Sequence, residues 1–167
     1  LDSPIISHLL QKLETTKEKI SFARVDSDTI ENLIKKEEEN ISKLNEKEKE
    51  TLNSYLEEII PKEKFTIQLE ASDSNTPPFM ITLPEFMRRM KDMQATGGSS
   101  MFGNMPEIYN LVVNTNSELI SNILNTKTKS KRERLINQSL DLAKLSQNLL
   151  KGQDLTNFIK RSFDLIK

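Results

Sequence analysis

EIYNLVVN, residues 107–114, decides the fold because it carries an almost unbroken run of strand-forming side chains. Ile108, Tyr109, Leu111, Val112 and Val113 are aromatic, β-branched or aliphatic, and such residues favour extended chain. A strand with few polar interruptions is typical of a position buried on both faces of a sheet. Residues 107–114 are therefore predicted to form the third and central strand of a small sheet.

Two further strands are predicted before this one. In residues 65–71, Phe65, Ile67 and Leu69 alternate with polar side chains, which is the pattern of a half-buried strand. Residues 79–83 form a second short apolar run after a turn at 73–78. Because the two runs are neighbours in the chain, they are predicted to pair as a hairpin with a longer loop.

Helical periodicity accounts for most of the remaining chain. Asn45 and Glu48 have the spacing of a capping box and open a helix predicted over residues 46–60. Further helices are predicted over residues 84–94, 117–125, 130–151 and 154–166, the last two separated at Gly152. The predicted fold class is α+β, with a small mixed three-stranded sheet, helices, and a helical pair at the end that forms an intermolecular four-helix bundle.

The first part of the chain has too little apolar surface to fold alone. Its pattern predicts a helix after Ser3 and Pro4, a short strand over 20–25 and a helix over 28–34. A charged segment of both signs follows and is predicted to be solvated. Residues 1–40 are accordingly predicted to be the end of a preceding domain, and residues 41–167 a domain of their own.

Composition excludes several classes of function. The net charge of −1 argues against a nucleic-acid-binding protein, which needs a basic surface. The chain has no cysteine and one histidine, His8, so no metal site is expected. The sequence shows no apolar run long enough to cross a membrane and no secretory n-region and h-region, so a cytoplasmic protein is expected. No phosphate-binding loop and no nucleophile with a histidine base is present, so no catalytic residue is predicted.

All six methionines fall within residues 80–105, together with three of the four glycines. Methionine is flexible and polarizable, so a cluster of methionines forms an adaptable binding surface. On the predicted helix at 84–94 the apolar side chains share one face and the other face is basic. Three basic side chains are few for a membrane-surface helix. The candidate binding residues are Phe86, Met87, Met90, Met93, Met101, Phe102 and Met105.

The last two helices carry apolar arcs wider than one supporting face requires. A two-fold dimer, in which the helices meet their copies in a four-helix bundle, accounts for these arcs. An entirely intramolecular helical bundle is the alternative. The candidate dimer-interface residues are Leu140, Leu142, Leu145, Leu149, Leu155, Phe158, Ile159, Phe163 and Ile166.

The order of these parts resembles the bacterial Hsp90 chaperones, from the end of their middle domain through their C-terminal domain. The resemblance rests on the RVDSD turn at residues 24–28, on PEIYNLVVNTNSELISNIL at 106–124, and on DLTNFIKRSFDLI at 154–166. The family usually has an Asn-Pro pair in the second of these segments, and this chain has Thr115 at the position of the proline.

The resemblance implies a stress-response chaperone module that forms homodimers through its terminal helices and binds unfolded client proteins. Phe86, Met90 and Met93 correspond best to the client-facing positions of the family. ATP and magnesium belong to other domains of the full-length protein, so no cofactor and no enzyme activity are expected in this chain. Two other hypotheses remain: a methionine-rich domain linked to RNA or signal-peptide binding, and a plain helical dimerisation scaffold.

Overall fold

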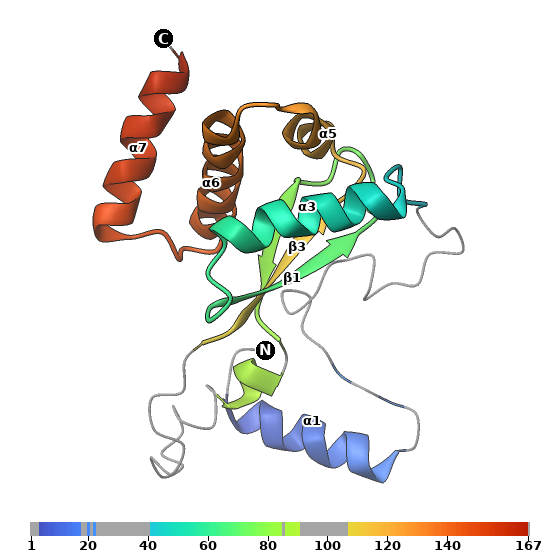
Figure 1. The fold of residues 1–167 in the computed structure, drawn as a ribbon. Helices are drawn as coiled ribbons and strands as arrows, with labels where there is room; N and C mark the ends of the chain where they lie inside the picture. Colours follow the sequence, from blue (N-terminus) through green and yellow to red (C-terminus); the bar gives the residue numbers. More distant parts are fainter. Residues whose placement is uncertain are drawn as a thin grey trace. The chain divides into compact units, whose positions relative to one another are not determined.

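The computed structural model describes residues 4–17, 20, 22, 41–84, 86–90 and 107–166 (Figure 1). These residues fall into two compact units, and each unit is described by itself. Unit 1 comprises residues 1–36 and 82–109, and unit 2 comprises residues 37–81 and 110–167. The domain boundary predicted at residue 40 lies outside the described residues, as do most of the strand predicted at 20–25 and the helix predicted at 28–34.

Most of the predicted elements are present with similar bounds. Unit 1 contains the helix α1, Pro4–Thr16, and a short helical segment at residues 86–90, drawn in yellow-green in Figure 1. The other elements are α3 Glu46–Ile59, β1 Phe65–Glu70, β2 Phe79–Thr82, β3 Tyr109–Asn114, α5 Glu118–Asn125, α6 Lys129–Ser146 and α7 Gly152–Ile166. The predicted α+β fold class is confirmed.

The strand order β1-β3-β2 confirms that the last strand is central and shows that the predicted hairpin is wrong. The N–H of Thr115 donates to the carbonyl of Glu70 at 2.7 Å, so the ends of β3 and β1 meet and these strands are parallel. The N–H of Asn114 donates to the carbonyl of Pro78 at 2.9 Å, so β2 runs antiparallel to β3. The sheet is therefore mixed, as predicted. Residues 71–78 pass over the end of β3 and contain the predicted turn, in which the N–H of Thr76 donates to the carbonyl of Asp73 at 3.0 Å.

The core of unit 2 lies around β3. Leu111, Val112 and Val113 are all fully buried, and since successive side chains point to opposite faces, both faces of this strand are covered. Helix α3 packs on β1, α5 and α6 (Figure 1). Further side chains with no exposed surface come from three helices: Leu52, Leu56, Ile120, Ile123 and Ile136.

Helix α3 begins where the sequence indicates. The Asn45 side chain accepts a hydrogen bond from the N–H of Glu48 at 3.0 Å, and the Glu48 carboxylate accepts one from the N–H of Asn45 at 2.9 Å. This reciprocal pair is the predicted capping box, and it satisfies two donors that the helix leaves without partners.

A buried polar cluster joins the end of β3 to two other segments. Asn114 has no exposed surface, and its side-chain oxygen accepts from the N–H groups of Ser72 at 3.1 Å and Asn116 at 3.0 Å. Its amide donates to the carbonyls of Asp73 at 2.8 Å and Thr76 at 3.3 Å. The side chain thus fixes the segment that passes over the end of the sheet.

Asn116 attaches the chain entering α3 to the same cluster. Its side-chain oxygen accepts from the N–H of Lys43 at 2.8 Å, and its amide donates to the carbonyl of Ile41 at 3.1 Å. The hydroxyl of Thr115 donates to the carbonyl of Glu70 at 3.1 Å. Four segments of chain therefore meet at the turn between β3 and α5.

Helix α6 ends earlier than the sequence pattern predicted. It stops at Ser146 instead of Lys151, because Asn148 adopts a left-handed conformation with φ of 56°. The N–H of Leu149 donates to the carbonyl of Lys144 at 2.8 Å, and the N–H of Asn148 donates to that of Leu145 at 3.0 Å. These two bonds make a Schellman motif, in which asparagine takes the place usually held by glycine.

Candidate functional site

In unit 1, the methionine-rich helix is described over residues 86–90. It begins after Pro84, whose carbonyl accepts from the N–H of Arg88 at 3.1 Å. Phe86 leaves 68% of its surface exposed, whereas Met87 and Met90 are half-buried. An exposed phenylalanine beside two half-buried methionines forms a small apolar surface. The other predicted binding residues lie outside the described part of the chain: Met93, Met101, Phe102 and Met105.

Arg89 holds this short helix against α1. Its guanidinium donates to both carboxylate oxygens of Glu14, at 2.9 and 3.0 Å, and to the carbonyl of Phe22 at 2.9 Å. The N–H of Phe22 donates to the same carboxylate at 2.7 Å. Two-pronged arginine–carboxylate pairs are geometrically specific. Arg89 therefore sets how the helix at 86–90 lies on α1.

The environment of Glu14 strongly favours its charged form. Hydrogen bonds from Arg89 and from the backbone N–H of Phe22 lower the pKa of Glu14 to about 2. Partial burial opposes this shift but does not overcome it. The carboxylate is thus ionised throughout the neutral range, and the pairing is present there.

In unit 2, α6 and α7 present a second apolar surface. Five of the nine predicted interface residues are exposed: Leu142, Leu145, Ile159, Phe163 and Ile166. Leu149 and Leu155 are half-buried. Leu140 and Phe158 are buried within the chain's own core, at 3% and 9% exposure. The wide apolar arcs therefore divide into an inner part that holds the chain together and an outer part that is uncovered in a single chain.

Polar contacts join α7 to α6. The Gln138 amide donates to the hydroxyl of Ser162 at 2.8 Å. Arg161 donates to the carboxylate of Asp141, which also accepts from Lys144 at 3.2 Å. Asp141 is only 9% exposed, so this ion pair lies mostly within the helix–helix contact. The contacts fix which face of each helix points outward.

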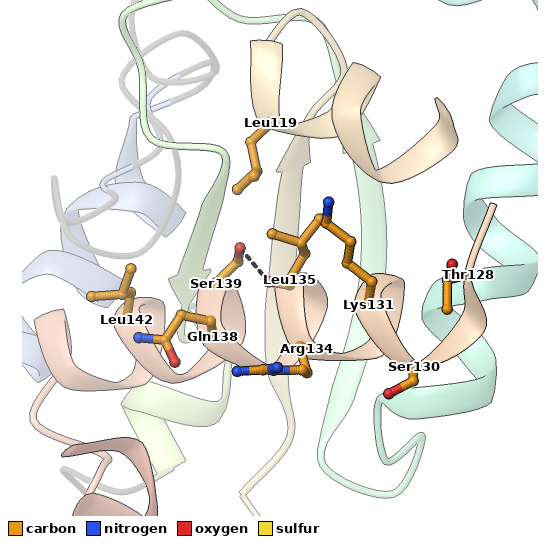
Figure 2. A pocket seen from close by; sticks show the side chains of 9 residues that line it. All are labelled: Leu119, Thr128, Ser130, Lys131, Arg134, Leu135, Gln138, Ser139 and Leu142. Carbon is orange, nitrogen blue, oxygen red and sulfur yellow. Dashed lines mark hydrogen bonds between the residues drawn. The ribbon is translucent and has the colours of Figure 1, made fainter. Parts of the chain in front are cut away.

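A groove of about 560 Å³ runs along α6 beside its contact with α7, because Gln138, which donates to Ser162 of α7, also lines the groove; the start of α5 borders it (Figure 2). Figure 2 shows Leu119 pointing from α5 toward Leu135 of α6. Leu142 continues the apolar lining, and the exposed side chains of Lys131 and Arg134 give it positive charge. No described side chain of the chain's own α7 lines the groove.

Several proteins that are similar to this chain carry the same name. Chaperone protein HtpG of Porphyromonas gingivalis is 39% identical over 149 residues, which cover 87% of this chain and 22% of that protein. The HtpG proteins of Bacteroides fragilis and Bacteroides thetaiotaomicron are 30% identical over 99% of this chain and 34% of their own length. The chain belongs to the Hsp90 family. It spans about a fifth to a third of the length of these Hsp90 relatives.

No family model matches the chain. Within the described ranges of this Hsp90-family chain, no helix has both the length and the apolar character needed to span a bilayer. The same residues contain no group of three or more histidine, aspartate or glutamate side chains placed to hold a metal ion.

The pairing of Glu14 with Arg89 was missed by the sequence analysis of this Hsp90-family chain. Seventy-five positions separate the two residues, and neither lies in a recognisable motif. The groove was missed as well, because Leu119 and Leu135 belong to different predicted helices. A helical projection could have placed Lys131, Arg134 and Leu135 on one face, but not Leu119 opposite them.

Proposed function

We propose that this chain is the homodimerisation and client-binding module of an ATP-dependent protein-folding chaperone. The exposed apolar surface of α6 and α7 carries the dimer part of the proposal. Soluble proteins seldom leave large apolar side chains together in water. The same surface on a second copy offers matching chemistry, as an isologous two-fold interface requires.

The exposed apolar surface of α6 and α7 is large enough to contribute substantially to dimerisation. Burying a half-exposed leucine, isoleucine or phenylalanine gains about 1 kcal/mol. Each of the two copies contributes five such side chains, so burying all of them in the dimer gains about 10 kcal/mol before any costs are subtracted. This gain is comparable to the free-energy cost of bringing two chains together, which is about 4 to 15 kcal/mol. The remaining contacts of a four-helix bundle add to the gain.

Sedimentation velocity over a concentration series tests the dimer. We expect a dimer at tens of micromolar, and a monomer there would refute the proposal. Leu145→Asp and Phe163→Asp should each raise the dimer dissociation constant by about 100-fold or more, because each places two carboxylates in the interface. Ile41→Asp is the matched control, since Ile41 is 87% exposed but lies outside α6 and α7.

The client-binding part of the proposal rests on Phe86. A large exposed aromatic beside flexible methionines is suited to partners of varied shape. Phe86→Ser should reduce the ability of the chain to suppress aggregation of an unfolded protein, with a change in unfolding free energy below about 0.5 kcal/mol. Ile41→Ser serves as the control. Unchanged suppression by Phe86→Ser would contradict this assignment.

The proposal gives this chain no nucleotide, no metal and no catalytic residue. ATP and magnesium would act in the remainder of the full-length protein, and the charge balance of the chain favours protein partners over nucleic acid. Steady-state ATP hydrolysis assayed on this chain and on the full-length protein separates the two parts. Hydrolysis by this chain alone would overturn the assignment.

A further inference from the structure

The ion pair between Arg89 and Glu14 joins three segments of unit 1 at one place. The carboxylate of Glu14 accepts from the guanidinium of Arg89 and from the N–H of Phe22. The carbonyl of Phe22 accepts from the same guanidinium, so both backbone groups of Phe22 are bound by the pair. The exposed fractions of the Arg89 and Glu14 side chains are 29% and 19%. Each of the three partners therefore depends on the other two, and a partner lost from a partly desolvated contact is costly.

The helix at 86–90 depends on a contact of this kind. Its predicted extent, residues 84–94, is shorter than the roughly 12 to 15 residues that an isolated helix needs to be marginally stable in water. The described turn lies beside α1 (Figure 1), and Arg89 bonds to Glu14 near the end of that helix. Docking on α1 therefore stabilises the turn, and Arg89 supplies the geometrically specific part of that docking.

Arg89 is also close to the exposed aromatic residue of the turn. Phe86 lies three residues earlier, so the two side chains are neighbours on the helix surface. With Arg89 bound to Glu14, Phe86 keeps 68% of its surface exposed, and Met87 and Met90 are half-buried. The docked turn thus already presents the aromatic ring to solvent, and the ion pair fixes the direction in which the ring points.

We propose that Arg89 is a positioning residue for client binding, which acts through Glu14 and the backbone of Phe22. This inference rests on the proposed binding of unfolded proteins at Phe86. While the contact is intact, Phe86 is held on an ordered turn. Once the contact is broken, a client has to order that turn when it binds, and the conformational entropy that is lost reduces its affinity.

Two substitutions that break the contact change the net charge in opposite directions. Glu14→Ala makes the chain more positive and Arg89→Ala makes it more negative, yet both should raise the dissociation constant for an unfolded protein. The probe is carboxymethylated lactalbumin, a permanently unfolded and acidic polypeptide, and fluorescence anisotropy follows its binding. We expect an increase of about tenfold for each variant. If charge alone governed binding, Glu14→Ala would bind this acidic probe more tightly, and that result would overturn the proposal.

Matched controls lie on the surface of α3, in unit 2. Glu50→Ala and Lys47→Ala make the same two changes in net charge, and both side chains are exposed. Their dissociation constants for the probe should equal that of the wild-type chain. A comparable increase in either control would overturn the proposal, because the effect would then not depend on the contact.

Double variants distinguish positioning from a general loss of structure. Glu14→Ala combined with Arg89→Ala should weaken binding no more than either substitution alone, because one contact can be lost only once. Adding Glu14→Ala to Phe86→Ser should have no further effect, because the turn then has no aromatic ring to present. Additive effects in either pair would refute the positioning role.

The outcomes separate this inference from the proposed function. If Phe86→Ser binds the probe as the wild-type chain does, the client site is wrong and the positioning role is refuted with it. If Phe86→Ser weakens binding but Glu14→Ala and Arg89→Ala do not, the client site stands and only the positioning role is refuted. The methyl resonance of Met87 should shift in both of these alanine variants. An unshifted resonance would show that the contact does not hold the turn, which also refutes the proposal.

Discussion

Replacing Asn114 by alanine should cost more stability than any exposed substitution in unit 2. The side chain makes four hydrogen bonds to backbone groups, of which three are 3.1 Å or shorter. Each bond contributes about 1 kcal/mol net, and a buried N–H left without a partner costs about 1 to 3 kcal/mol. Asn114→Ala leaves the backbone N–H groups of Ser72 and Asn116 without their hydrogen-bond acceptor. We expect the free energy of unfolding to fall by about 3 kcal/mol.

Urea unfolding followed by far-ultraviolet circular dichroism measures this loss. All variants are compared at one protein concentration, because a dimer's stability depends on concentration. Asn122→Ala is the matched control, since Asn122 is exposed on α5 and its side chain forms no hydrogen bond in the described structure. A loss below about 1 kcal/mol for Asn114→Ala would refute the reasoning that this side chain secures the segment over the sheet.

Three other predictions address local features. Thr115→Pro, which introduces the residue usual in the family, should lower the free energy of unfolding by about 1 to 3 kcal/mol, because it removes the N–H that donates to the carbonyl of Glu70. A urea unfolding curve unchanged from that of the wild-type chain would contradict this. The ion pair between Glu14 and Arg89 should be intact above about pH 4.5 and be lost as the pH falls toward 2, because the pKa of Glu14 is lower in the folded chain than in the unfolded chain. The methyl resonance of Met87 should shift over this pH range. In Glu14→Gln this pH-dependent shift should be absent. Asn148→Ala should lower the free energy of unfolding by about 1 kcal/mol and Asn148→Gly should not, because the backbone at this residue is left-handed, with φ of 56°. Equal effects of the two substitutions on urea unfolding would argue against the left-handed cap.

Local patterns predicted the elements but not how they pair. The alternation in β1, the apolar run in β3 and the capping box before α3 are all set by neighbouring residues, so the sequence was sufficient. The order of the strands is not local. Two consecutive strands favour a hairpin, but here the hydrogen bonds of Asn114 hold residues 71–78 across the end of β3, and β1 and β2 are kept apart.

The candidate surfaces show the same limit. Periodicity identified both apolar faces, but it did not divide the interface candidates into buried residues such as Leu140 and exposed ones such as Leu145. That division depends on which side of α6 the neighbouring elements cover. The early end of α6 was harder to predict from the sequence. Asparagine adopts left-handed conformations less often than glycine, so Gly152 was predicted to end the helix instead of Asn148.

The strand order also determines when the sheet can form during protein synthesis. The strands β1 and β2 leave the ribosome first, yet neither pairs with the other, because each takes its partner from β3. Until residue 114 has emerged, both strands have unpaired edges, and such edges invite association with other chains. Nascent chains of this segment therefore pass through an interval in which they themselves need protection from aggregation.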